Sequence, residues 1–207
     1  MATSRSNVEK ATMFLLSTNP DRTAGRRTAI AMSRIHAYLR AARLQARMIE
    51  NFQRRAIPTK PSYSANLIQA YIFAHLYFIC WAAILRMIGV IKNYSHMQTP
   101  NKLYKRYRKI LEDYSHARHH FGHYEERLPG GKKSKVLDNP SDFGNLRGEH
   151  FSLGGTSWDV GRESLKILET IVADLSTGIC QEGRQRAKER QAAKLSMKAQ
   201  VSNRFAN

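Results

Sequence analysis

Cysteine is scarce in this chain of 207 residues, which contains only Cys80 and Cys180. Neither belongs to a CxxC motif or to any other closely paired spacing. Disulfide frameworks and structural zinc sites need such pairs, so the sequence argues against both classes of protein. The N-terminus also lacks an apolar run as long as the core of a secretory signal, and we therefore expect a cytoplasmic protein.

Acidic residues are few as well, because 16 Asp and Glu stand against 34 Lys and Arg, for a formal net charge of +18. This excess is larger than solubility requires. It predicts a polyanionic partner, with nucleic acid favoured over an acidic membrane surface. The alternative is that the charge lies in solvated tails and has no specific partner.

Apolar residues recur at three- to five-residue steps through most of the chain, which is typical of amphipathic helices. Helices are predicted over residues 25–55, 67–91, 99–128 and 158–178, the third with Thr99 as its N-cap. Residues 129–157, rich in Gly, Lys and Asn, predict a loop insertion that carries a small hairpin around Gly154-Gly155.

These patterns predict an all-α protein, a helical bundle of about four main helices with the loop insertion between the last two. We expect a single helical domain over residues 1–180. Residues 181–207 are polar, basic and weakly periodic. They are expected to form a basic C-terminal tail, either as a solvated helix or as a disordered segment.

The longest apolar run, residues 67–91, is interrupted only by Gln69, His75 and Arg86. A membrane span needs about twenty predominantly apolar residues, so the run is borderline in length. Its interior His and Arg, and the apolar faces of the other helices, favour the central core helix of a bundle, with membrane association as the alternative. His75 is then expected to be a core histidine with its hydrogen bonds satisfied rather than a ligand.

A positive stripe runs along the predicted helix 25–55, where arginines follow one another at three- to four-residue steps. Glu50 is the one acidic residue in this segment, so i,i+4 ion pairs cannot neutralise the stripe. Phosphate contact and simple solvation both account for such a face. With two loop lysines added, the candidate nucleic-acid-binding residues are Arg40, Arg43, Arg47, Lys132 and Lys133.

A histidine cluster ends the third predicted helix, in the segment SHARHHFGHYEERLPGG at residues 115–131. His119 and His123 stand at i and i+4 with Glu126 three residues further on, a spacing that suits zinc on one helix face. Convincing third and fourth ligands are not evident elsewhere in the sequence, so we predict neither a metal nor another cofactor.

The same segment supports acid–base chemistry on RNA, because histidine titrates near neutrality and arginine supplies a permanent cation for a phosphate oxygen. RHHFGH, from Arg118 to His123, resembles the signature of the HEPN superfamily: an Arg, a polar residue, three to five further residues and a His. This resemblance implies an all-α bundle, often dimeric, that acts as a metal-independent endoribonuclease in toxin–antitoxin, phage-defence or RNA-targeting systems. It implies that Arg118 binds the scissile phosphate, that His123 is the general base or acid, and that His119 orients the pair.

Helix geometry constrains this hypothesis, because residues five apart lie about 140° round the axis and about 7.5 Å along it. Arg118 and His123 therefore converge poorly on one helix, and a site requires a second chain or another helix. The alternative is a polar helix end, in which His120 and His123 donate to the final carbonyls while Arg118 pairs with a nearby carboxylate.

The leading hypothesis is thus a HEPN-like ribonuclease or RNA-binding protein, expected to bind RNA and to form a homodimer. An antitoxin or another partner protein is a further expected partner, whereas a membrane is not. The alternative function is a non-catalytic basic helical scaffold that binds nucleic acid or a partner protein through the same surface.

Overall fold

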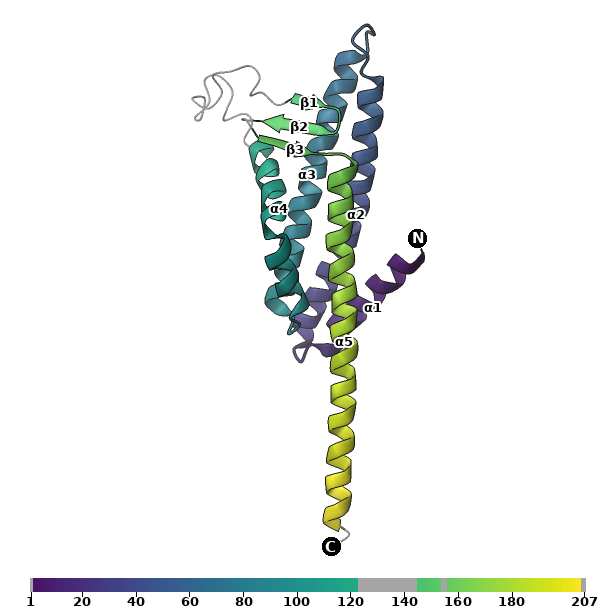
Figure 1. Ribbon diagram of the computed structural model, residues 1–207, viewed down its shortest axis with the longest axis vertical. Helices are drawn as coiled ribbons and strands as arrows, with labels where there is room; N and C mark the ends of the chain where they lie inside the picture. The colour runs from purple at the N-terminus through teal and green to yellow at the C-terminus, as the bar shows by residue number, and fades with distance from the viewer. Residues whose placement is uncertain (1, 123–144, 154–155, 206–207) are drawn as a thin grey trace.

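The computed structural model describes residues 2–122, 145–153 and 156–205, most of which lie in long α-helices (Figure 1). The elements are α1 (Ala2–Thr18), α2 (Arg22–Arg55), α3 (Tyr63–Tyr94), α4 (Thr99–Gly122), β1 (Asn145–Arg147), β2 (His150–Leu153), β3 (Thr156–Asp159) and α5 (Arg162–Phe205). The expected all-α bundle, with an insertion between its last two main helices, is confirmed.

Helices α2 and α3 form a long antiparallel hairpin (Figure 1). Asp21 caps the start of α2, where its carboxylate accepts a hydrogen bond of 2.8 Å from the backbone N–H of Thr23. At the turn, the side-chain amide of Asn66 donates to the carbonyl of Arg55 at 3.0 Å. The apolar face of α2 is buried in the core through Met32, Ile35, Leu39, Ala42 and Ile49.

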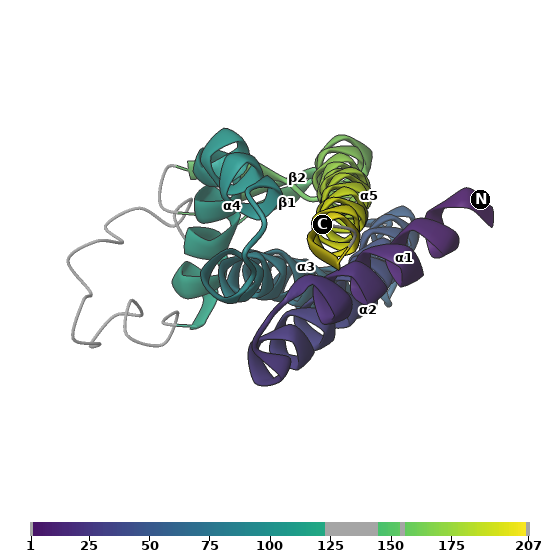
Figure 2. The same ribbon diagram turned by 90° about the horizontal axis from the view of Figure 1, so that it is seen from below.

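Helix α3 lies between α2 and α4 (Figure 2), and it supplies the largest buried side chains of the bundle. Among the described residues it is also the one helix long and apolar enough to cross a membrane, and 56% of its most apolar 18-residue window is buried inside the bundle. This burial agrees with the predicted core helix. The N-terminal half of α3 nevertheless exposes three large side chains, Ile68, Ile72 and Leu76.

The three strands form an antiparallel sheet in the order β1-β2-β3. The predicted hairpin corresponds to β2 and β3, with Phe151 paired opposite Trp158, and β1 is an additional strand. Gly148 makes the turn between β1 and β2 with a φ of 56°, a conformation that favours glycine. Phe151 and Trp158 are buried against the helices, so one face of the sheet extends the helical core.

Both ends of the chain are more helical than the sequence analysis indicates. Helix α1 was not predicted, yet Ala11 and Leu15 are buried against the rest of the core. Helix α5 continues without a break to Phe205, so the expected boundary between residues 180 and 181 lies inside it. Figure 1 shows the C-terminal half of α5 projecting beyond the other helices. Of the two forms expected for the C-terminal tail, the helical one is present as far as Phe205.

The start of α4 is capped from outside its own segment. Thr99 is the first residue of α4, but the capping group is the carboxylate of Glu182 on α5. This carboxylate accepts hydrogen bonds from the backbone N–H groups of Gln98 at 2.8 Å and Thr99 at 2.9 Å, and from the Thr99 hydroxyl at 2.9 Å. The contact joins α4 to α5 and satisfies backbone donors that the helix itself cannot pair.

The packing of α1 on α5 predicts the effect of one methyl group. A Cβ added at Gly183 would overlap the side chain of Phe14 on α1, whereas a Cβ at Gly89 of α3 meets nothing within 4 Å. Gly183→Ala is expected to lower the free energy of unfolding by about 1–3 kcal/mol, because overpacking displaces α1. Gly89→Ala, the matched control, is expected to be neutral or up to about 1 kcal/mol more stable. Urea denaturation followed by circular dichroism measures both, and equal effects would contradict the described α1–α5 contact.

Candidate functional site

The residues predicted to be catalytic lie at and beyond the end of α4. Arg118 and His119 are on its last described turns, and both side chains are exposed. His123, Lys132 and Lys133 lie outside the described residues. The predicted Arg118–His123 pair therefore lies partly outside the described residues, and the described part of the candidate site is Arg118 with its neighbours on other elements.

The direction of Arg118 follows from the packing of the residues just before it. Tyr114 and Ala117 are buried, and the Tyr114 ring stacks on Trp81 of α3 with a centroid separation of 4.0 Å and an interplanar angle of 16°. The Tyr114 hydroxyl donates to the carbonyl of Asp159 on β3 at 2.7 Å. Because these contacts hold one face of α4 against α3 and the sheet, Arg118 is left at the surface beside them.

The side chain that α3 brings to Arg118 is His75. It follows the fully buried Ala74 and is itself only partly buried. Burial, and then the positive charge of Arg118, lower the pKa of His75 below its ordinary value. The imidazole is therefore neutral at neutral pH and lies within electrostatic reach of a guanidinium from the next helix.

His75 is the functional candidate that sequence reasoning missed, because its position in an apolar run suggested a core histidine. Two signals pointed towards it. Arg118 needed a partner from another helix or another chain, and His75 is one of only three polar interruptions in residues 67–91. Which helix supplies the partner depends on the packing of α3 against α4, which the sequence does not display.

A polar network behind the site ties α3, β3 and α5 together. The Tyr77 hydroxyl shares a hydrogen bond of 2.8 Å with the Ser164 hydroxyl in the buried interior. Asp159 accepts from the backbone N–H groups of Gly161 at 3.1 Å and Ser164 at 2.9 Å, which caps the start of α5. Burial raises the pKa of Tyr77, so its hydroxyl stays protonated and keeps this hydrogen bond.

The three arginines of the positive stripe, Arg40, Arg43 and Arg47, have different surroundings in the structure. Arg40 and Arg47 are exposed, whereas the Arg43 guanidinium forms an ion pair of 2.6 Å with Glu169 of α5. The stripe lies on α2, while Arg118 lies on α4, and both helices pack against α3 (Figure 2). The predicted phosphate-binding and catalytic arginines therefore belong to different helices of the bundle.

His36 lies on the same helix as the stripe, and two arginines of the stripe affect its pKa. It lines a cavity of about 220 Å³ between α2 and α5, with its Nε2 3.5 Å from the Ser176 hydroxyl. Burial, followed by the charges of Arg40 and Arg43, lowers the pKa of His36 to about 4. His36 is therefore neutral at pH 7 and adds no charge to the stripe.

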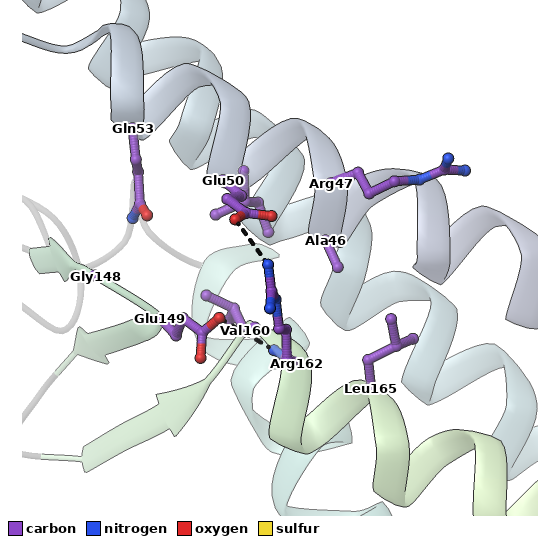
Figure 3. Close-up of a pocket in the computed structure, with 11 residues that line it drawn as sticks. Ala46, Arg47, Glu50, Gln53, Gly148, Glu149, Val160, Arg162 and Leu165 are labelled. Atoms are coloured by element: carbon purple, nitrogen blue, oxygen red, sulfur yellow. Dashed lines mark hydrogen bonds and ion pairs between the residues drawn. The ribbon is translucent and has the colours of Figure 1, made fainter.

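Another cavity, of about 300 Å³, lies between α2, the β1–β2 turn and the start of α5 (Figure 3). Arg162 forms an ion pair of 3.3 Å with Glu50, and its backbone N–H donates to the Glu149 carboxylate at 3.4 Å. Figure 3 shows Arg47 directed away from this pair. Because the carboxylates in the cavity already bind Arg162, we assign them to holding α2, the turn and α5 together.

Metal ligands do not gather in the described part of the chain. Within residues 2–122, 145–153 and 156–205, no group of three or more His, Cys, Asp and Glu side chains could hold a metal ion. The spacing that suited zinc involves His119, His123 and Glu126, and the last two lie outside the described residues.

Comparison with protein-family models, with curated proteins and with solved structures found no match to this chain. Its fold and charge define a strongly basic all-α helical bundle. Within that class, the feature best suited to acid–base chemistry is the neutral His75, whose pKa is affected by the exposed Arg118 of the neighbouring helix.

The proximity of Arg118 to His75 has a direct spectroscopic test. Arg118→Gln removes a positive charge beside the imidazole, so the pKa of His75 is expected to rise, while burial keeps it below the ordinary value. Arg118→Lys is expected to leave it low, and Arg86→Gln, an exposed arginine further along α3, is the matched control. Titration of the histidine ring carbons by NMR measures all three variants. A His75 titration curve that does not move in Arg118→Gln would show that the two side chains are not neighbours.

Proposed function

We propose that this protein is a HEPN-like, metal-independent endoribonuclease or RNA-binding protein. The observation that carries the proposal is the lowered pKa of His75, caused first by burial and then by the charge of exposed Arg118, in a chain with a net charge of +18. An arginine binds phosphate oxygens, and a neutral imidazole accepts a proton, which are the two functions that RNA cleavage without metal requires.

The proposed reaction is a transesterification within the RNA. His75 accepts the proton of the ribose 2′-OH as its oxygen attacks phosphorus, and the bond to the 5′-oxygen of the next nucleotide breaks. Arg118 stabilises the charge that grows on the phosphate oxygens. His123, the histidine of the HEPN-like signature, is the proposed donor of a proton to the departing 5′-oxygen, and His119 orients Arg118. The products are a 2′,3′-cyclic phosphate and a 5′-OH.

The RNA-binding residues, partners and location proposed for this reaction are those that the sequence favoured. RNA is held by Arg40 and Arg47, with Lys132 and Lys133 as further candidates, while Arg43 is occupied by Glu169. A homodimer, an antitoxin or other partner protein, and a cytoplasmic location complete the proposal.

Cleavage of single-stranded RNA in EDTA tests the catalytic proposal. The wild-type protein is expected to produce fragments with 2′,3′-cyclic phosphate ends. Arg118→Ala, His75→Gln and His123→Ala are each expected to reduce the cleavage rate by about 10²-fold or more, because each removes charge stabilisation or proton transfer.

The controls for this assay are an exposed arginine and an exposed histidine outside the proposed site, Arg86→Ala and His96→Ala, which are expected to cleave at the wild-type rate. Circular dichroism of each variant separates loss of activity from loss of fold. No cleavage by the wild type, or cleavage by all three site variants at the wild-type rate, would refute the catalytic proposal and leave only binding.

The alternative function, a non-catalytic scaffold that binds nucleic acid, is favoured by the far end of α5. Arg190 binds the bundle through a hydrogen bond of 3.0 Å to the Thr18 carbonyl. Beyond it, the side chains of residues 191–197 are exposed. Residues 181–207 contain seven Lys and Arg and two Asp and Glu, so this projecting helix is a surface that suits a polyanion.

The salt dependence of RNA binding distinguishes the exposed arginines of the positive stripe from Arg43, which binds Glu169. This test applies to both proposed functions. Replacing Arg40 and Arg47 together by Gln is expected to weaken RNA binding and to reduce the slope of log K against log salt by about 2, since each phosphate contact contributes about 1. Arg43→Gln is expected to leave the slope nearly unchanged, because its guanidinium binds Glu169. Fluorescence anisotropy over a salt series measures both, and an equal change in slope for the two proteins would contradict the described ion pair.

A further inference from the structure

An open, mostly apolar groove lies between α1 and α2. It has a volume of about 600 Å³ and is lined by residues 12 and 16 of α1 and by residues 26, 29, 30, 33, 34 and 37 of α2. We call it the α1–α2 groove. Leu16 and Ile30 in its wall are 39% and 54% exposed. Large apolar side chains that gather at one place on the surface are typical of an interaction site.

The floor of the groove admits a helix. Ala29, Ser33 and Ala37 follow one another at four-residue steps along α2 and line the groove. Small side chains at this spacing leave a straight channel along a helix, into which the ridge of another helix packs. The lined stretch from Arg26 to Ala37 is about 16 Å long at 1.5 Å per residue, which corresponds to about three helical turns.

The charge of the groove determines which kind of helix would bind in it. Arg26 and Arg34 line it, and the lining contains no carboxylate. An apolar ridge flanked by carboxylates would therefore complement the groove both in its floor and at its edges. A nucleic acid would satisfy the arginines and leave Leu16 and Ile30 without apolar partners.

A second copy of this chain is a poor occupant for the same reason. The chain has only 16 acidic residues, and six carboxylates of its described part already form ion pairs. They are Glu50, Glu112, Glu163, Glu169, Asp174 and Glu182. Two chains that each carry a net charge of +18 repel one another, and Arg26 and Arg34 at the groove add to that repulsion.

We propose that the α1–α2 groove binds a helix of a different, acidic protein. This helix is amphipathic and about three turns long. It inserts its apolar ridge over Ala29, Ser33 and Ala37 against Ile30, and it places carboxylates beside Arg26 and Arg34. The proposal is independent of any action on RNA, since it uses no residue of the Arg118–His75 site.

Synthetic peptides test the proposal on the full chain. The probe is a fluorescein-labelled amphipathic peptide of about 18 residues, long enough to form a helix by itself, with Leu and Ala on one face and Glu on the others. One control peptide keeps the apolar face and replaces Glu by Lys. The second keeps Glu and replaces the apolar face by Ser. At physiological salt, only the first peptide is expected to bind with a saturable increase in anisotropy.

Variants of the protein locate the binding. Ile30→Asp is expected to weaken binding of the acidic peptide by about tenfold or more, because it places a charge in the apolar contact. The double variant Arg26→Ser, Arg34→Ser is expected to weaken it and to abolish the preference for Glu over Lys. Leu44→Asp is the matched control, since Leu44 is a 49% exposed leucine on α2 outside the groove.

Each other outcome would overturn the proposal. Equal binding of the Glu and Lys peptides would remove the charge argument, and equal binding of the Ser peptide would reduce the interaction to general attraction. Equal effects of Ile30→Asp and Leu44→Asp would place the contact elsewhere. Displacement of the peptide by phosphatidylglycerol vesicles or by RNA, with the same dependence on Ile30, would assign the groove to a membrane or to nucleic acid instead.

Discussion

The aromatic contacts of Phe78 connect the parts of the molecule that carry the candidate site. Its ring is fully buried on α3. The centroid of this ring lies 6.0 Å from that of Tyr114 on α4, 5.7 Å from that of Phe151 on β2 and 6.0 Å from that of Trp158 on β3. These edge-on and tilted contacts bury large apolar areas in one place. The sheet is too small to be stable alone, so it depends on this cluster, and the end of α4 is held in the same way.

The site is a consequence of that cluster rather than a separate feature. Tyr114 binds the core through its ring and binds Asp159 through its hydroxyl, which sets the rotation of α4 about its axis. Arg118, one helical turn further on, is therefore held at the surface, where its charge acts on His75 of α3. Partial burial then acts on His75 chemically, because it lowers the pKa of the imidazole and keeps it neutral beside a guanidinium.

The excess of positive charge is distributed over several surfaces and not concentrated at the candidate site. Arg43 and Arg162 bind carboxylates that join helices, so these arginines contribute to the fold. Other cations remain on the exposed face of α2, along the projecting end of α5 and at the α1–α2 groove. A basic chain of this kind can bind a polyanion on one face and an acidic helix on another, because the two faces differ in apolar content.

Much of the fold follows from residue patterns. The recurrence of apolar residues located α2, α3, α4 and the first half of α5, and the glycine pair at residues 154 and 155 marked the hairpin of β2 and β3. Helix α1 was missed because only a few of its residues are apolar, and the long continuation of α5 was left open because its composition is polar. The cap on α4 could not be found by pattern, since Glu182 reaches Thr99 from a distant helix.

The sequence by itself determined the class of fold, the strong positive charge and the candidacy of Arg118, because helical periodicity, ionisable groups and short motifs are local properties. Only the tertiary structure decided which groups meet. The packing of α3 against α4 placed His75 where the charge of Arg118 affects its pKa, and the packing of α2 against α5 paired Arg43 with Glu169. These contacts depend on the rotation and crossing of whole helices, which many buried side chains set together and no single segment encodes.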